Sequence, residues 1–477
     1  MTNKEKYYKF IINFSFVVIL FLGIINTING DDFFWHVKIG KWIVDNKQIP
    51  KTGIFSWFAK DSNWFAHEWL SEILMYLCSL ISIKYAAHIF LTICILILGI
   101  ILSYINRNRF YKSPILLIIW EILGFCTITT FSTARPHWIT LFLLVIYICI
   151  LEEIKKNTYK HIWIIPIIAI IWSNVHGGSS NLLYLLPIGF LLTGINNWKI
   201  GKLSSHKMNK KQLCIYLITI ITNILCICIN PRGIELLKYP YSYKEMNLEY
   251  ITEWLPLSYG NLKLAFIVII GIIILLCISK KQEIELSEFG LIFLFIIMSF
   301  IHLRFVLWTY VITSIYIFKY FNEFKHKDKI KKENMILFFN IFCTLASIII
   351  ILSPFFVKNI NVSKPIPNEL IEIIKEDTPD RLYNDYNYGG YLIYNDIPVF
   401  IDGRADMYEW IGSFEENMKI QSFSLDYESN IDEYIKKYEF DAILTSKNNY
   451  INLVVRNLKN FNVIYENEKI IYYEIIK

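Results

Sequence analysis

Residues 29–69 read NGDDFFWHVKIGKWIVDNKQIPKTGIFSWFAKDSNWFAHEW and form the first long polar segment after an apolar run that ends near residue 28. Its polar side chains include two adjacent aspartates, two histidines and a glutamate, namely Asp31, Asp32, His36, His67 and Glu68. Such groups perform general acid–base chemistry, and a carboxylate can also hold a metal ion on a phosphate. The alternative is that Asp31 and Asp32 only end an apolar helix and stay hydrated. The nearby histidines favour a reaction site beside a bilayer.

The composition places the chain among membrane proteins. Of its 477 residues, 55% are hydrophobic and only 18% are charged, which is too apolar for a soluble protein. A spanning helix needs about 20 mostly apolar residues. One acid, Glu121, interrupts the apolar runs and should face the bundle interior beside a polar partner. We predict about eleven spans, near residues 9–28, 84–105, 113–132, 136–153, 162–176, 179–196, 213–230, 262–279, 285–301, 303–320 and 335–356.

Lysine and arginine predict the orientation. If the N-terminus is cytoplasmic and residues 68–82 do not cross, the basic clusters of alternate loops all fall on the cytoplasmic side, as the positive-inside rule requires. The net charge of +6 is spread over these short clusters, so it does not indicate nucleic-acid binding. Residues 68–82 have one apolar and one polar helical face, which is typical of a helix at the membrane interface.

The chain changes character from about residue 359, where apolar runs stop and short strand-like pieces appear. We predict helices at 366–376, 431–438 and 450–458, strands at 398–401 and 442–445, and a terminal strand pair at 463–466 and 470–475. The predicted organisation is therefore a membrane domain at 1–358, with a first outer loop at 29–83, and an extracytoplasmic α/β domain at 359–477.

Three arginines, Arg135, Arg232 and Arg304, lie in loops that this topology places outside, against the positive-inside trend. A guanidinium can bind phosphate through two parallel hydrogen bonds, so the set predicts an anionic ligand such as a lipid-linked phosphate. Each arginine alone can instead snorkel to lipid headgroups. The other candidates for substrate binding on this side are His36, His67, Glu68, His137, Asn174 and His176.

Two motifs of the C-terminal domain are rich in polar and aromatic residues around glycines. They are NDYNYGGYLIYND at 384–396 and VFIDGRADMY at 399–408. In one interpretation, aspartates and an arginine form an internal network that holds a loop. In the other, the motifs bind an acceptor, and the candidate residues are Asp385, Tyr388, Asp402, Arg404 and Asp406.

Motifs along nearly the whole chain resemble those of bacterial multi-spanning membrane proteins of the GT-C glycosyltransferase superfamily. The matching pieces are DDFFWH, FSW, NWFAHEWLSEIL, TARPHW, NVHGGS, NPRG, YGGYLIY and PVFIDGRADMY. The chain is more distantly similar to oligosaccharyltransferase catalytic subunits and protein O-mannosyltransferases. NDYNYGGY is similar to the acceptor-reading motif of oligosaccharyltransferase subunits, without its tryptophan pair. The resemblance implies an α-helical bundle, an outward soluble domain, and a catalytic acid in the first outward loop, a position that Asp31 and Asp32 match.

The resemblance also implies a function. We expect a glycosyltransferase of the bacterial plasma membrane that moves a sugar from a polyprenyl-phosphate donor to a glycan, lipid or protein acceptor on the outer face. Asp31 or Asp32 would act as base, and the arginines would hold the donor phosphate. Metal use stays open, with Mg²⁺ or Mn²⁺ as candidates, and no other cofactor is expected. A transporter or flippase of a lipid-linked or anionic solute and a non-catalytic membrane scaffold are the alternatives.

Overall fold

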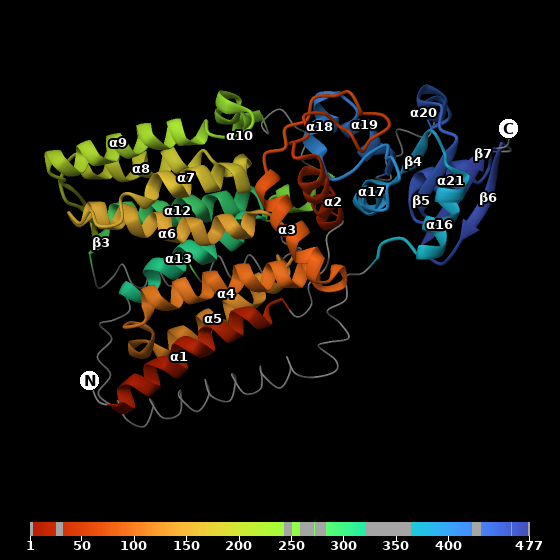
Figure 1. The fold of residues 1–477 in the computed structure, drawn as a ribbon. Coiled ribbons are helices and arrows are strands. Elements are labelled where there is room, and N and C mark those ends of the chain that lie inside the picture. Colours follow the sequence, from red (N-terminus) through yellow and green to blue (C-terminus); the bar gives the residue numbers. More distant parts are fainter. Residues whose placement is uncertain are drawn as a thin grey trace. The chain divides into compact units, whose positions relative to one another are not determined.

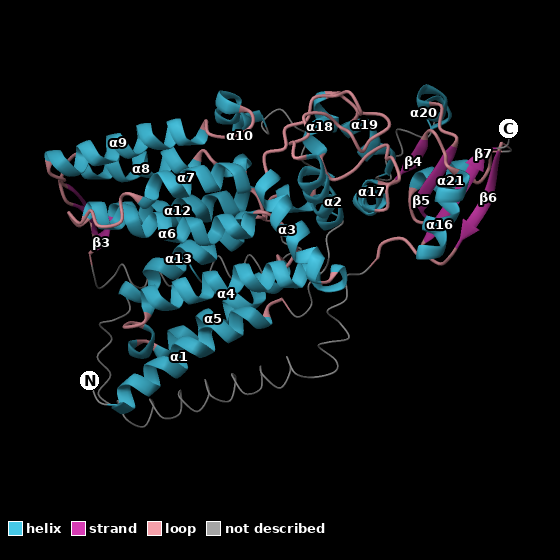
Figure 2. Ribbon diagram, in the orientation of Figure 1, coloured by secondary structure: helices cyan, strands magenta, loops and turns pink. Residues whose placement is uncertain are grey.

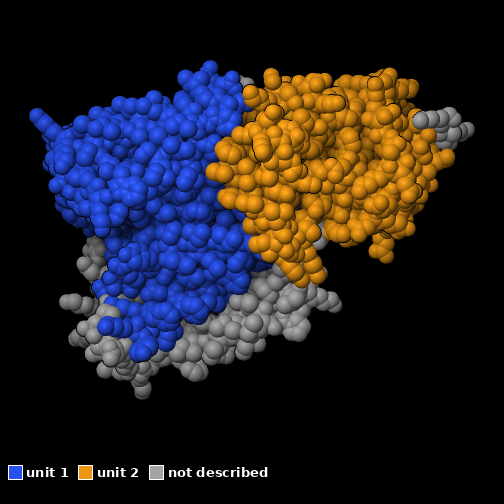
Figure 3. Space-filling model, in the orientation of Figure 1, with its two compact units in different colours: residues 1–28, 88–240, 251–361 blue, residues 29–87, 241–250, 362–477 orange. Residues whose placement is uncertain are grey.

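A computed structural model describes residues 3–24, 32–242, 250–257, 271, 283–320, 364–421, 431–458 and 460–475. The chain divides into two compact units, which Figure 3 colours separately. Unit 1 comprises residues 1–28, 88–240 and 251–361, and unit 2 comprises residues 29–87, 241–250 and 362–477. The first loop, which the sequence assigns to the membrane domain, therefore belongs to the same compact unit as the C-terminal residues.

Unit 1 is built from helices (Figures 1 and 2). They are α1 (Asn3–Leu22), α4 (Ala86–Asn106), α5 (Pro114–Thr130), α6 (His137–Lys155), α7 (Ile164–Val175), α8 (Leu182–Gly194), α9 (Lys210–Ile227), α12 (Leu286–Ile301) and α13 (Phe305–Tyr320). Each lies on one of the predicted apolar runs. The predicted runs at 262–279 and 335–356 lie outside the described residues, apart from position 271.

Short elements connect these helices. A small sheet has the strand order β1 (Trp198–Ile200), β2 (Leu203–Ser205) and β3 (Ile284–Glu285), with β1 antiparallel and β3 parallel to β2. The short helical turns are η1 (Ile83–Tyr85), η2 (Phe110–Lys112), η3 (Gly177–Ser179), η4 (Gly233–Leu237), α10 (Tyr239–Ser242) and η7 (Thr252–Trp254). The last of these turns carries part of the candidate site described below.

Several helices have the length and apolarity of membrane spans. Within the described residues, Ile83–Asn106, His137–Lys155 and Lys210–Ile227 are long and apolar enough to cross a bilayer. Shorter apolar helices of 10–17 residues accompany them, among them Ile164–Val175 and Phe305–Tyr320. These helices indicate a membrane protein.

Polar side chains tie the apolar helices of unit 1 together. The Asn223 amide of α9 donates to the Tyr147 hydroxyl of α6 (2.6 Å) and to the Leu183 carbonyl of α8 (2.7 Å). Glu121 of α5 is 1% exposed and accepts a hydrogen bond from Ser15 of α1 at 3.1 Å. The prediction that Glu121 faces a polar partner inside the bundle is confirmed. Such bonds matter in an apolar medium because water cannot replace them.

The C-terminal part of unit 2 is a four-stranded sheet with helices. The strand order is β4 (Leu382–Asn384), β5 (Ala442–Ser446), β7 (Ile470–Ile475) and β6 (Phe461–Glu466). Strands β4 and β5 are parallel, and the other neighbours are antiparallel. The helices are α16 (Asn368–Asp377), α17 (Tyr386–Tyr394), α18 (Ala405–Trp410), α19 (Phe414–Gln421), α20 (Ile431–Tyr438) and α21 (Tyr450–Val455).

The first loop contributes two helices and an extended segment to unit 2. Helix α2 (Asp32–Asn46) packs on α3 (Trp69–Ile81), and Gly40 makes this possible, because a Cβ there would lie 2.1 Å from the Glu72 carbonyl oxygen. The predicted strand at 398–401 is wrong. Val399 forms only an isolated parallel bridge with Ser56, because its N–H and carbonyl bond to the first loop at Phe55 and Trp57.

Helix α3 has the amphipathic character predicted for residues 68–82. Its buried side chains are Ser71, Glu72, Met75 and Cys78. Its apolar side stays uncovered in the structure, with Leu77, Leu80 and Ile81 at 48%, 62% and 73% exposure. An apolar helix face left open beside a buried polar face is what an interfacial helix presents to lipid.

Candidate functional site

Asp32 is the first residue of α2 and lies against the VFIDGRADMY motif. The Trp35 indole N–H donates to its Oδ1 at 3.1 Å, which fixes the side chain within one helical turn. A Cβ on Gly403 would lie 2.0 Å from the same oxygen and 2.7 Å from the indole nitrogen. Glycine at position 403 therefore allows the motif to approach the carboxylate. The other candidate base, Asp31, lies outside the described residues.

The first-loop histidines and glutamates predicted as substrate-binding residues come together. His36 is buried, with Nε2 3.9 Å from Glu68 Oε2 and Nδ1 3.6 Å from Glu72 Oε1. His67 Nε2 lies 3.6 Å from Glu68 Oε1. The sequence did not single out Glu72. The available signal was its position four residues after Glu68, which places both acids on one helical face.

Glu72 is the least solvated acid of this group. It is 1% exposed, and neither carboxylate oxygen has a hydrogen-bond partner among the described residues. Burial, and then the charge of Glu68, raise the pKa of Glu72 well above its usual value, while the charge of Arg404 opposes the shift. A proton on Glu72 is therefore held more tightly than on an exposed glutamate.

Arg404 forms the internal network that was one of the two interpretations of its motif. Its guanidinium donates to both carboxylate oxygens of Asp402, at 2.8 and 2.7 Å, and Tyr408 donates to the same carboxylate at 2.7 Å. The Trp64 ring lies 5.0 Å from the guanidinium carbon. Burial lowers the pKa of Arg404, but Asp402 outweighs it, so the guanidinium stays charged. The network braces the loop on both sides of Gly403.

The remaining candidates for acceptor binding are Asp385, Tyr388 and Asp406, which are buried or half-buried in unit 2. The Asp385 carboxylate accepts hydrogen bonds from Thr445 (2.8 Å), the Ser446 backbone N–H (2.7 Å) and Asn449 (2.5 Å), which joins the start of α17 to the end of β5. Burial raises the pKa of Asp385 to about 6, against these hydrogen bonds. Tyr388 lies half-buried on α17, and Asp406 is buried in the first turn of α18.

Unit 1 holds a separate cationic cluster. Glu253 lies between two of the predicted phosphate-binding arginines, with Oε2 2.5 Å from Arg135 Nη1 and Oε1 3.6 Å from Arg304 Nη1. The Arg304 guanidinium also lies over the Trp254 ring, 4.4 Å from its centroid. Burial alone would raise the pKa of Glu253, but Arg135, Arg304 and then His137 lower it to about 2. The ionised Glu253 carboxylate is therefore held between two guanidinium groups.

The third arginine and the NVHGGSS residues have other partners. Arg232 Nη1 lies 3.8 Å from Glu235 one turn away. The Asn174 amide donates to the Ile229 carbonyl at 2.9 Å. His176 Nδ1 lies 3.1 Å from the Thr140 hydroxyl and 2.8 Å from that of Ser179. Both buried side chains thus join neighbouring helix ends.

Among the described residues, no three His, Cys, Asp or Glu side chains lie close enough together to hold a metal ion. The residues with the strongest site character are therefore Asp32 beside Gly403 in unit 2, and Arg135, Arg304 and Glu253 in unit 1. The sequence did not indicate Glu253, because it is one of four glutamates in residues 230–256 and no local pattern sets it apart.

Comparison with known proteins supplies the fold. The chain is similar to the crystal structure of the Archaeoglobus fulgidus oligosaccharyltransferase tethered with an acceptor peptide containing the NVT sequon, with a TM-score of 0.57 and 10% sequence identity. The match covers 93% of this chain and 69% of that chain. No protein-family model and no curated protein matches the sequence. The chain therefore has an oligosaccharyltransferase-like fold.

Proposed function

We propose that the protein is a GT-C-type membrane glycosyltransferase that moves a sugar from a polyprenyl-phosphate-linked donor to an acceptor on the outer face of the membrane. The observation that carries the proposal is the oligosaccharyltransferase-like fold over 93% of the chain. The apolar helices supply the membrane setting that a lipid-linked donor needs. The distribution of lysine and arginine supports a cytoplasmic N-terminus and outward-facing loops.

The proposed reaction breaks the bond between the sugar C1 and the donor phosphate oxygen. An acceptor hydroxyl or amide attacks C1, its proton passes to the carboxylate of Asp32 or Asp31, and the polyprenyl phosphate leaves with the bonding electron pair. In support of Asp32, the Trp35 indole donates to its carboxylate, and glycine at position 403 leaves room for it. A pre-positioned base loses less entropy in reaching the transition state.

Arg135 and Arg304 would receive the charge of the leaving phosphate. Both guanidinium groups contact Glu253 and are partly open to solvent. Such a site favours an anion without stranding an unpaired buried charge.

Two experiments test the proposal. Lipid mass spectrometry of the purified protein should find a co-purifying polyprenyl-phosphate sugar, and this lipid then serves as donor in a transfer assay in membranes. Replacing Asp31 and Asp32 by asparagine, singly and together, should lower the transfer rate by about 10²–10⁴-fold for the variant that lacks the base. Asp45→Asn is the matched control, because Asp45 lies on the same helix and is exposed. Undiminished transfer by a folded double variant would sink the mechanism.

A further inference from the structure

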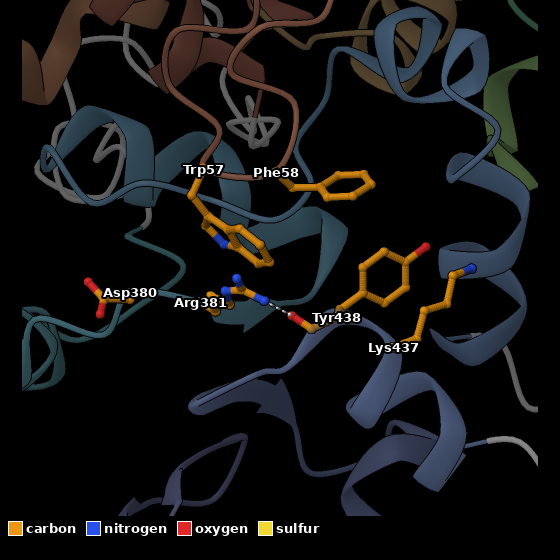
Figure 4. Close-up of a pocket in the computed structure, with 6 residues that line it drawn as sticks. All are labelled: Trp57, Phe58, Asp380, Arg381, Lys437 and Tyr438. Atoms are coloured by element: carbon orange, nitrogen blue, oxygen red, sulfur yellow. Dashed lines mark hydrogen bonds between the residues drawn. The ribbon is translucent and has the colours of Figure 1, made fainter.

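A pocket of about 420 Å³ opens on unit 2, and none of the residues assigned to transfer above lines it. Three segments of the chain line it, as Figure 4 shows: the first loop, the residues before β4, and the end of α20. The lining side chains are Trp57, Phe58, Asp380, Arg381, Lys437 and Tyr438. Half of them are aromatic and half are charged.

The aromatic walls are fixed before any ligand arrives. The Trp57 indole N–H donates to the Leu382 carbonyl at 3.0 Å, and its ring stacks on Phe400 with centroids 5.4 Å apart. The Tyr438 hydroxyl donates to Glu416 at 2.8 Å, and its ring meets that of Phe58 edge-on at 5.3 Å. Rigid walls lose little conformational entropy when a ligand binds.

The charged groups at the rim already have carboxylate partners. Lys437 Nζ lies 2.8 Å from Glu416, and Arg381 pairs with Glu439. Asp441 accepts the backbone N–H groups of Asp380 and Arg381. Together with the Asp380 side chain, these make four carboxylates beside two cations among the described residues, so the rim disfavours an anionic ligand. It does offer donors and acceptors side by side.

We propose that this pocket binds a neutral sugar ring. A pyranose has one face of C–H groups that packs on flat aromatic rings, and its hydroxyls both donate to carboxylates and accept from ammonium and guanidinium groups. A pocket of 420 Å³ has room for about one or two such rings. The inference adds a carbohydrate-binding site to the protein, and it does not require that the protein transfers sugars.

The test is binding of neutral oligosaccharides to the full-length protein in detergent. The probes are glucose, mannose, galactose and N-acetylglucosamine oligomers, with uronic-acid oligomers and a sugar-free hydrophilic peptide for comparison. At least one neutral series should bind, and Trp57→Ala should weaken it by at least about tenfold. Trp57→Phe, which keeps a flat ring, should lose less. Trp410→Ala is the control, because Trp410 is an exposed tryptophan that does not line the pocket.

If Trp57→Ala does not fold, substitution of a charged residue at the rim of the pocket still tests the proposal. Lys437→Ala removes a side chain that is 56% exposed, and it should weaken sugar binding about threefold, the loss expected for one exposed hydrogen bond. Lys436→Ala, on the same helix and also exposed, should bind as the wild type does. Asp32→Asn should bind normally even where it abolishes transfer. The proposal is overturned if no neutral oligosaccharide binds, if the uronic acids or the peptide bind better, or if Lys437→Ala and the folded Trp57 variants bind unchanged.

Discussion

Arg404 in unit 2 and the Arg135–Arg304 pair in unit 1 differ in their carboxylate partners and in their exposure to solvent. Arg404 pairs with Asp402 through two parallel hydrogen bonds, and both side chains are 0% exposed. In unit 1, Glu253 contacts two arginines, Arg135 and Arg304, which retain 28% and 22% exposure. The first cluster is closed to solvent, while the second is partly open.

The difference distinguishes an arginine that stabilises the fold from arginines that can bind a ligand. A buried one-to-one pair cannot change partners without leaving an ion uncompensated, so Arg404 acts as a brace for the loop at Gly403. A partly solvated pair of arginines can accept a further anion at little cost. Both kinds of arginine looked alike as candidate ligand contacts in the sequence. Four substitutions test this contrast.

The largest effect is expected when the closed cluster is broken. Arg404→Met should lower the free energy of unfolding by about 3–5 kcal/mol, because Asp402 then stays buried without its partner. Chemical unfolding followed by tryptophan fluorescence measures the loss. Arg456→Met, which removes a half-exposed pair with Glu466, is the control and should leave the unfolding midpoint in place. Equal midpoints for the two variants would show that Arg404 is no brace.

The open cluster should respond to the loss of the Glu253 carboxylate. The Glu253 pKa is lowered to about 2, so ionised Glu253 stabilises the fold above its unfolded value of 4.5, and this contribution is lost as the pH falls through 2. Glu253→Gln should therefore cost about 3 kcal/mol at pH 7, with the difference from wild type shrinking below pH 4.5. Glu235→Gln, at an exposed carboxylate, serves as control. A stability difference between Glu253→Gln and wild type that does not change with pH would contradict a stabilising role for the ionised Glu253 carboxylate.

The closed cluster can also be disturbed without removing a charge. Gly403→Ala places a Cβ 2.0 Å from Asp32 Oδ1, so either the loop or the carboxylate has to shift. We expect a loss of about 2 kcal/mol in stability and a lower transfer rate. Gly290→Ala in α12 is the control, since a Cβ there meets nothing within 4 Å. Full stability and activity of Gly403→Ala would mean that the close approach is unnecessary.

The smallest effect concerns Glu72, which faces His36, Glu68 and Arg404. Because its pKa is raised in the folded state, wild-type stability should fall as the pH rises above 4.5 towards the folded pKa. Glu72→Gln removes this decline, so the variant should be more stable than wild type by on the order of 1 kcal/mol at pH 8. Glu369→Gln, at an exposed position of α16, should follow the wild-type pH profile. Parallel profiles for all three proteins would refute the assignment.

Sequence patterns predicted best where periodicity is strong and local. The apolar runs of unit 1 that fall within the described residues, the helix at 431–438 and the terminal strand at 470–475 appear in the structure within six residues of their predicted positions. Helix α17 was missed because its glycine pair disfavours a helix. Tertiary packing decides there: a Cβ on Gly389 would lie 2.3 Å from the Ile401 carbonyl oxygen, so the glycine is needed for contact rather than for a turn.

The candidate site was predicted in part. Asp32, His36, His67 and Glu68 were found because they cluster within one loop. Their partners could not be assigned, because Gly403 and Arg404 are distant in sequence and a single chain contains no information about such pairs. The same limitation hid Glu253, whose charge becomes meaningful only beside two arginines of other loops. The catalytic and binding roles of all these residues stay predictions.

The contact between Ser56 and the segment at 399–400 has a consequence for biosynthesis. Ser56 and Phe400, whose hydroxyl and carbonyl are 3.5 Å apart, are separated by 344 positions in the chain. At a synthesis rate of 5–20 residues per second, the first loop waits roughly 20–70 s for its partner. Its aromatic side chains, Trp57 and Phe58 among them, lack their C-terminal cover during that time. Unit 2 can therefore mature only after the last part of the chain has been made, and premature termination leaves the loop open to quality control.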